Sequence, residues 1–182
     1  RVHRFRRNWE RIIPTHSKIQ YAGNMGLLSF GIGWDYGKRN QWETDIFFGI
    51  LPKYDSKRTK ITMTLKQNYM PWSIALGKEF AVEPLACGMY FNTVFGNEFW
   101  THEPERYPKG YYGFSSKVRI HVFLGQRLTY NIPPRWRLGA RAVTFYYEIS
   151  TCDLYVVSAF TNKYLKPKDY LSLSFGLKTQ LF

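Results

Sequence analysis

The chain has 182 residues, a length suited to one domain, and no stretch approaches the roughly 20 consecutive apolar residues of a membrane-spanning helix. Aromatic residues make up 19% of it, yet its mean hydropathy of −0.38 is that of a water-soluble protein. The formal net charge of +13 implies an anionic partner, which is either nucleic acid, phosphate-bearing lipid or an acidic protein surface.

Residues 1–17 are predicted to be a basic segment outside the folded domain. Their apolar residues recur near helical spacing until Pro14 interrupts the pattern. Such a segment lies at a membrane interface on the periplasmic side or remains a disordered tail, and the sequence leaves both alternatives open. Residues 18–182 are predicted to form the single folded domain.

From residue 19 onward, apolar and polar residues alternate with period two in one run after another, which predicts strands with two different faces. The run 19–36 is long for one strand, so we divide it at Gly23-Asn24, a pair that favours a turn. The run 80–95 is apolar on both faces and does not show which face is which. The predicted strands are the two parts of 19–36, then 42–51, 61–69, 80–95, 117–125, 143–150 and 171–181.

The last run shows the alternation most clearly. Between Leu171 and Leu181, mainly leucine and phenylalanine occupy one face, while serine, glycine, lysine and glutamine occupy the other. Eight such strands without a helical stretch are typical of an outer-membrane β-barrel. We therefore predict an all-β fold, an eight-stranded antiparallel up-and-down transmembrane β-barrel in a bacterial outer membrane. The final Phe182 resembles the C-terminal aromatic residue that serves as a barrel-assembly signal.

The polar faces of the strands carry many charged residues. A soluble core tolerates such charges only when nearly all of them are paired. A narrow barrel lumen holds interdigitated acids and bases, and eight strands leave an interior that side chains fill, so we expect no conducting pore. The predicted lumen charge network consists of Glu43, Asp45, Lys66, Lys117, Arg119, Glu148 and Lys178.

An even number of strands places both termini on the periplasmic side and the longest connections outside the cell. The expected periplasmic connections are 37–40, 75–79 and 129–139, and the expected extracellular ones are 54–60, 96–112 and 151–169. Basic residues gather in the connections, which suits the phosphates of outer-membrane lipids and lipopolysaccharide better than a nucleic-acid groove. Ordinary solvated loops are the alternative. The predicted lipid-phosphate-binding residues are Lys57, Arg58, Lys60, Lys163, Lys166 and Lys168.

The connection 96–112 combines aromatic residues, prolines and charges. Stiffened by proline, its rings form either a surface for another outer-membrane protein complex or an aromatic girdle at the level of the headgroups. The candidate partner-surface residues are Phe99, Trp100, Tyr107, Tyr111 and Tyr112.

The segment 145–154 brings a glutamate and a serine to one face of a late strand, two residues apart. Together with the strand end 33–36, the segment 80–84 and a final strand that ends in an aromatic residue, it resembles the lipid A deacylases. These are small outer-membrane barrels that remove an acyl chain from lipopolysaccharide. Members carry His-x-Ser-Asn on the late strand, and the matching residues here are Glu148-Ile-Ser150-Thr.

The resemblance implies that Ser150 is a nucleophile. Glu148 occupies the position of the family's histidine base, and a carboxylate is a poorer base for a serine proton at neutral pH. Alternation also turns both residues toward the lumen, whereas the ester of a membrane lipid is reached from the outer wall. These departures make catalysis by Ser150 and Glu148 the second hypothesis rather than the first.

The histidines and the two cysteines show no metal-ligand spacing, so neither a metal nor another cofactor is predicted. His121 is expected to be a packed residue of the lumen face. His16 is placed before the barrel, and His102 lies in a connection. Cys87 and Cys152 either pair in an oxidising compartment or, as we favour, are small residues of the barrel wall.

The sequence leads to three functional hypotheses. The first is an integral outer-membrane β-barrel with a plugged, charged lumen, a non-enzymatic structural or accessory subunit that contacts lipopolysaccharide and another envelope protein. In style the chain also looks like small barrels of Bacteroidota-type bacteria. The second is a lipid A deacylase-like serine hydrolase, and the third is a soluble basic β-barrel that binds nucleic acid or a small ligand. We predict the first, with no nucleic-acid partner.

Overall fold

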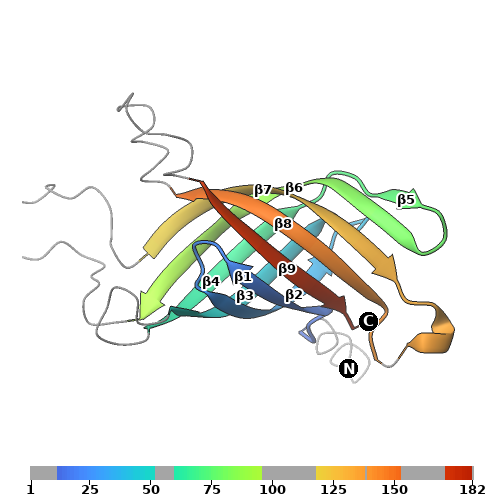
Figure 1. The fold of residues 1–182 in the computed structure, drawn as a ribbon, viewed down its shortest axis with the longest axis horizontal. Helices are drawn as coiled ribbons and strands as arrows, with labels where there is room; N and C mark the ends of the chain where they lie inside the picture. Colours follow the sequence, from blue (N-terminus) through green and yellow to red (C-terminus); the bar gives the residue numbers. More distant parts are fainter. Residues whose placement is uncertain (1–11, 52–59, 96–117, 138, 153–170, 182) are drawn as a thin grey trace, which may run out of the picture.

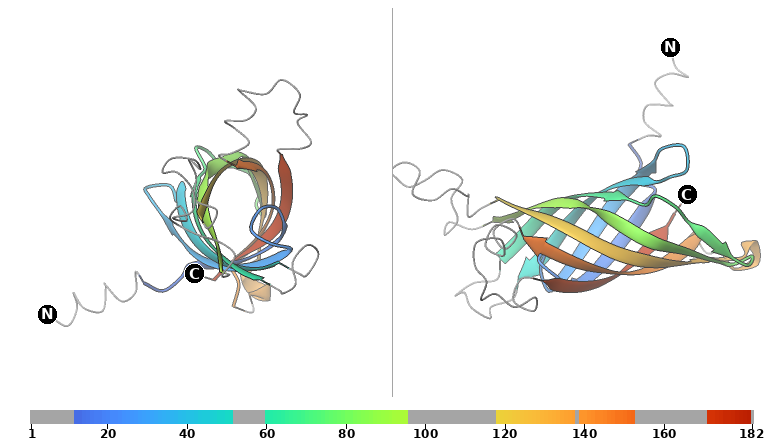
Figure 2. Two further views of the ribbon diagram at one scale, coloured as in Figure 1. Left: turned by 90° about the vertical axis from the view of Figure 1, so that its left-hand side faces the viewer. Right: turned by 90° about the horizontal axis from the view of Figure 1, so that it is seen from above.

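The computed structural model describes residues 12–51, 60–95, 118–137, 139–152 and 171–181. Eight long strands form a closed antiparallel up-and-down barrel, which confirms the predicted all-β, eight-stranded architecture (Figures 1 and 2). No helix in these ranges is long and apolar enough to cross a bilayer. The elements are β1 (His16–Ala22), β2 (Leu28–Tyr36), β3 (Trp42–Leu51), β4 (Lys60–Tyr69), β5 (Ile74–Leu76), β6 (Phe80–Phe95), β7 (Val118–Asn131), the 3₁₀ turn η1 (Pro134–Trp136), β8 (Ala142–Cys152) and β9 (Ser172–Gln180).

The barrel closes because the last strand pairs with the first. β9 lies antiparallel to β1, with Gln180 opposite His16, and every other long strand pairs with its neighbours in the chain. The short strand β5 does not add to the circumference, since it pairs with the beginning of β6 beyond the end of β4. Closure leaves no long strand with an unpaired edge, which is the usual weakness of a sheet.

The two ends of the barrel differ. At the short-turn end, on the right in Figure 1, lie the β2–β3 turn, the segment around β5, the β7–β8 connection with η1, the start of β1 and the end of β9. At the opposite end, which we call the long-loop end, lie the β1–β2 turn, the ends of β3, β6 and β8, and the starts of β4, β7 and β9. Residues 52–59, 96–117 and 153–170, which follow β3, β6 and β8 in the chain, are outside the described residues.

Most predicted strand boundaries agree with the structure. The division of 19–36 is confirmed, because β1 and β2 are separate strands joined by a turn at Gly23. The connection predicted at 129–139 is wrong at its start, since β7 continues to Asn131, and β5 occupies part of 75–79. β8 likewise runs to Cys152, so its loop begins later than predicted.

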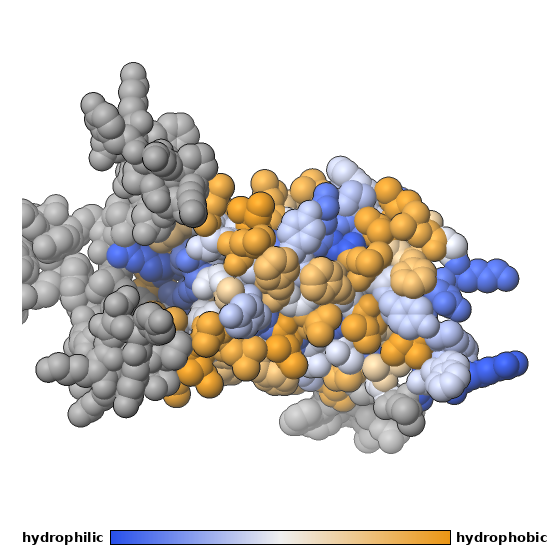
Figure 3. Space-filling view, in the orientation of Figure 1, coloured by the Kyte–Doolittle hydropathy of each residue, from blue (hydrophilic) through white to orange (hydrophobic). Residues whose placement is uncertain are grey.

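The two faces of the wall have opposite character. Along the strands, one residue in two is apolar and roughly half exposed on the outside, and Figure 3 shows such side chains spread over the visible face of the barrel. The alternate residues face inward and are buried, although most of them are polar or charged. The outward apolar residues include Ile19, Phe30, Phe48, Leu65, Phe91, Leu124, Phe145 and Leu177.

A β-bulge in β6 explains why its sequence showed no clear alternation. Glu83 pairs with Arg127, but the next pair is Ala86 with Gly125, so β6 contains one extra residue between them. The extra residue changes which positions face inward, from Glu83 before the bulge to Ala86 and Tyr90 after it. Pro84 stands within the bulge, where its missing N–H costs no ladder hydrogen bond.

Glycines inside the strands make room for large rings in the interior. A Cβ atom at Gly31 would lie 2.6 Å from the Phe47 ring, and one at Gly176 would overlap the Tyr146 ring. Phe47 and Tyr146 are both fully buried. Gly31 and Gly176 therefore allow these interior rings to approach the strands closely.

Candidate functional site

A buried carboxylate, Glu43 of β3, lies at the centre of the barrel interior. It accepts hydrogen bonds from Lys18 of β1, from Arg127 Nη1 of β7 at 3.1 Å, and from Lys178 of β9. These cations come from three strands around the barrel, and each is nearly or fully buried. Glu43 thus links opposite parts of the wall through charge-assisted hydrogen bonds.

Two aspartates on neighbouring strands, Asp45 of β3 and Asp35 of β2, extend this arrangement. Asp45 accepts hydrogen bonds from Lys18 at 2.7 Å and from the side-chain amide of Asn68 at 2.7 Å. Asp35 accepts one from Lys178 at 2.7 Å. The His16 ring lies between them, 2.8 Å from Asp45 and 3.2 Å from Asp35.

A separate ion pair joins Lys66 of β4 to Glu148 of β8. Aromatic rings surround its ammonium group, with Nζ 4.2 Å from the Phe123 ring centre and 5.6 Å from that of Tyr146. The ring faces stabilise the cation where water does not reach it. We use the term interior network for both groups together: His16, Lys18, Asp35, Glu43, Asp45, Lys66, Asn68, Arg127, Glu148 and Lys178.

The charges of the interior network balance. Its four cations are Lys18, Lys66, Arg127 and Lys178, and its four carboxylates are Asp35, Glu43, Asp45 and Glu148. Buried charges are tolerated when each has a partner of opposite sign and satisfied hydrogen bonds. The interior network meets that condition almost completely.

His16, Asp35 and Glu43 each offer one ligand atom within 4.8 Å of the others, a grouping that the sequence spacing did not indicate. Both carboxylates already accept hydrogen bonds from Lys178, and Glu43 also from Arg127. A divalent cation would have to displace these groups from a balanced set of charges. We therefore assign the grouping to the interior network and not to a metal site.

The structure brings together most of the predicted lumen residues. Glu43, Asp45, Lys66, Glu148 and Lys178 face inward as parts of the interior network. Arg119 also lies on the inward-facing positions of β7, near the long-loop end, and takes no part in the described ion pairs of the network. Lys117 lies outside the described residues.

Sequence analysis missed His16, Lys18, Asp35 and Arg127 as members of the network. The placement of His16 before the barrel is wrong, because it is the first residue of β1 and fully buried. Apolar alternation begins only at Ile19, so the polar run before it looked like a loop. Every second residue counted backward from the inward-facing Gln20 gives Lys18 and His16, which would have identified both as inward-facing residues.

The β1–β2 turn closes the interior at the long-loop end. The Asn24 side chain donates a hydrogen bond to Ser150 of β8 at 3.3 Å and accepts one from Ser172 of β9 at 2.9 Å, and the backbone carbonyl of Asn24 accepts one from the side chain of Asn92 of β6. Met25 is buried against Phe47, Tyr90 and Phe123. The turn is therefore tied to strands across the barrel and occupies its interior. 

The surroundings of Ser150 do not form a nucleophile–base pair. Its hydroxyl oxygen lies 3.0 Å from the Tyr90 hydroxyl and 3.3 Å from Asn24 Nδ2. Glu148 is engaged by Lys66, and His121 stacks on the Tyr90 ring at 4.6 Å. A serine nucleophile needs a base within hydrogen-bond reach, and no described carboxylate or imidazole bonds to Ser150.

Several residues considered in the sequence analysis have no described position. Lys57, Arg58, Lys163, Lys166, Lys168, Phe99, Trp100, Tyr107, Tyr111, Tyr112, His102 and Phe182 lie outside the described residues, as do residues 1–11. Lys60 begins β4 at the long-loop end, where the lipid-phosphate hypothesis needs it. The cysteines are small wall residues on opposite faces: Cys87 lies opposite the outward Leu124, and Cys152 is buried.

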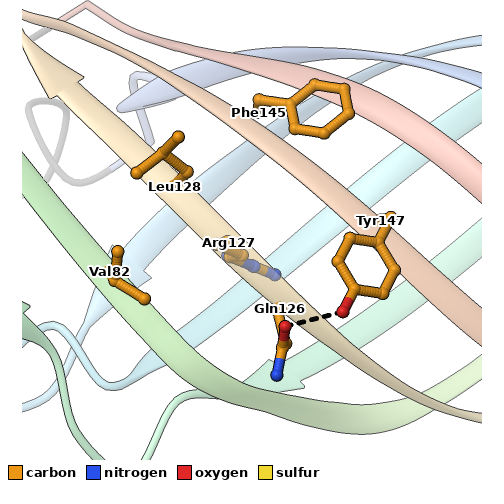
Figure 4. A pocket seen from close by; sticks show the side chains of 6 residues that line it. All are labelled: Val82, Gln126, Arg127, Leu128, Phe145 and Tyr147. Atoms are coloured by element: carbon orange, nitrogen blue, oxygen red, sulfur yellow. Dashed lines mark hydrogen bonds between the residues drawn. The ribbon is translucent and has the colours of Figure 1, made fainter.

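An apolar groove of about 310 Å³ marks the outer wall beside the β6 bulge (Figure 4). Val82, Leu128 and Phe145 line it, and at one end Tyr147 donates a 2.6 Å hydrogen bond to the side chain of Gln126. This bond satisfies two polar groups on an otherwise apolar surface.

Comparisons with known proteins add no family to this description. No protein-family model, curated protein or solved structure matches the chain. The function is therefore inferred from the fold and the side chains alone, which belong to a closed eight-stranded barrel with an apolar outside and a charged inside.

Proposed function

We propose that the protein is an integral barrel of a bacterial outer membrane, with both termini on the periplasmic side. The observation that carries this proposal is a distribution of polarity opposite to that of a water-soluble protein. Half-exposed apolar residues surround a buried interior of paired charges. Water favours the opposite arrangement, whereas acyl chains favour this one. A closed barrel also satisfies every backbone group of its wall, as a bilayer requires.

The aromatic residues at the short-turn end support the membrane location. Trp42 packs against Tyr69 with ring centres 4.5 Å apart, and Phe80 against Tyr130 at 5.1 Å, both near strand ends. Aromatic girdles stand at headgroup level in outer-membrane barrels, whose short turns are periplasmic. The long-loop end then faces outward, where the basic connections meet the phosphates of lipopolysaccharide.

We infer a structural or accessory role, in which the protein contacts lipopolysaccharide and another envelope protein. The filled interior argues against a channel. In this proposal Lys57, Arg58, Lys60 and the lysines of 163–168 bind lipid phosphates. Purification from native membranes tests the accessory role: a complex that survives detergent supports it, and a monomer without partners contradicts it.

The membrane location is tested by extraction and heat-modifiable migration. We expect the chain to require detergent for extraction and to run faster on a gel before boiling than after it. A chain that stays soluble without detergent would overturn the proposal and favour the soluble basic barrel. 

Lipid A deacylation remains the alternative hypothesis, and mass spectrometry of lipid A tests it. We expect the same acyl pattern in cells that lack the protein, contain it, or contain Ser150→Ala, because Ser150 has no adjacent base. Ser174→Ala, on the inward face of β9, is the matched control. An acyl chain lost with the wild type and with Ser174→Ala but kept with Ser150→Ala would establish the hydrolase instead.

A further inference from the structure

The short-turn end of the barrel opens into a polar cavity of about 410 Å³, which we call the mouth cavity. Asp35, Lys178 and Gln180 connect it to the interior network. Its remaining polar side chains come from the β2–β3 turn, the segment before β5, the start of β6, and the strands and connection of β7 and β8. They include Arg39, Glu83, Asn131, Arg137, Arg141 and Thr144.

Three arginines supply the distinctive charge of the mouth cavity. Arg39 belongs to the β2–β3 turn, while Arg137 and Arg141 belong to the β7–β8 connection. Arg137 Nε donates a 3.0 Å hydrogen bond to the carbonyl of Ile132, which holds the side chain and leaves its two terminal nitrogens for another acceptor. Within the described ranges, none of the three forms an ion pair.

The acids of the mouth cavity do not neutralise these arginines. Asp35 already accepts hydrogen bonds from Lys178 and from Gln180 at 2.9 Å, and it contacts His16. Glu83 has its described ion contact with Arg127, at 3.9 Å. The positive charge of Arg39, Arg137 and Arg141 therefore remains available to an anion that enters the cavity.

We propose that the mouth cavity binds a phosphate-bearing ligand through Arg39, Arg137 and Arg141. The planar guanidinium fork matches phosphate oxygens in a bidentate geometry, and the neutral side chains Asn131 and Thr144 add hydrogen-bonding groups. The volume of about 410 Å³ suits a small ligand. A second hollow of about 220 Å³ shares Arg39 and extends below Trp72, with room for an organic moiety.

The ligand is either a free phosphorylated compound or the headgroup of a phospholipid, since both present the same oxygens. Trp72 and Trp136 are exposed at this end of the barrel and would meet lipid headgroups. Phosphate binding goes beyond the proposed membrane role and does not depend on it, because the cavity belongs to the barrel itself.

Calorimetric titration of pyrophosphate into the full chain, in an uncharged detergent at fixed ionic strength, tests the proposal. Arg137→Gln and Arg141→Gln are each expected to weaken binding about tenfold or more, through the loss of charge-assisted hydrogen bonds. Arg135→Gln is the matched control, because it removes the same charge from the same connection but Arg135 does not line the cavity. It is expected to bind as the wild type does.

Two competitors distinguish the source of the phosphate. Glycerol phosphate displaces pyrophosphate if the ligand is free, and only a phosphatidylglycerol with short acyl chains does so if the ligand is a headgroup. Arg141→Lys keeps the positive charge but lacks the planar guanidinium group, and it is expected to bind pyrophosphate more weakly than the wild type. This variant replaces the glutamine variants in the test if they do not fold. The proposal would be overturned if neither pyrophosphate nor the short-chain lipid bound. It would also be overturned if Arg135→Gln lost as much affinity as Arg137→Gln and Arg141→Gln. Either result would leave the proposed membrane insertion unaffected.

Discussion

Replacing Glu43 with glutamine is expected to lower the free energy of unfolding by about 3–5 kcal/mol, the usual effect of breaking a buried ion pair. Glutamine keeps the size of the side chain but removes the negative charge that faces Lys18, Arg127 and Lys178. These cations are buried and would lose their shared counter-charge. Unfolding by urea of the protein in detergent or lipid vesicles measures the change.

Glu83→Gln is the matched control for this prediction. Glu83 also faces Arg127, but at 3.9 Å and with its side chain 20% exposed, so its loss is expected to cost less than about 1 kcal/mol. Adding Arg127→Met to Glu43→Gln removes the cation that has no other carboxylate closer than 3.9 Å, and this double variant is expected to recover part of the stability. Equal unfolding midpoints for Glu43→Gln and Glu83→Gln would show that the interior network does not stabilise the barrel.

Leu124→Arg is expected to destabilise the protein in a bilayer by about 2–4 kcal/mol, the effect of a cation on the lipid face near the midplane. Leu124 is 60% exposed and lies midway along β7, from Val118 to Asn131. In water such an exposed position would accept arginine with almost no change in stability. Urea unfolding in lipid vesicles measures the difference.

Trp136→Arg is the control for the lipid-facing substitution. Trp136 is also large and apolar and is 75% exposed, but it lies in η1, beyond the ends of the strands. Arginine there is expected to cost about 0–1 kcal/mol, because charges near the interface are tolerated. If Leu124→Arg proved as harmless as Trp136→Arg, the apolar face would not lie in lipid and the membrane proposal would fail.

The strands and their two faces could be predicted because period-two alternation is a local property of the sequence. The inward position of Glu43 follows from it. The division of 19–36 follows instead from its length and the turn-favouring pair Gly23-Asn24, and the filled interior follows from the number of strands. The bulge in β6 could not be predicted from alternation, since one additional residue after Glu83 exchanges the two faces. Pro84 was the local signal that could have indicated it, because prolines inside strands occur at bulges.

The contacts inside the barrel could not be predicted from alternation alone. Glu43 bonds to Lys18, Arg127 and Lys178, which are 25, 84 and 135 residues away in the sequence. The alternation of faces shows that each side chain points inward. Only the closure of the barrel determines how far along its axis each side chain lies and which of them come into contact. The same reason applies to Arg39 and Arg141, whose positions in two connections gave no sign of a shared cavity.

Because β9 pairs with β1, the barrel can close only after its last strand has been synthesised. Lys178, which partners both Asp35 and Glu43, lies on β9 and is therefore synthesised after the other seven long strands of the barrel. Until then Asp35 and Glu43 lack the Lys178 ammonium group, and the first strand has an open edge. Native contacts of such large sequence separation slow folding. The nascent protein therefore gains most of its stability in one late, cooperative step, and a chain interrupted before β9 is left without it.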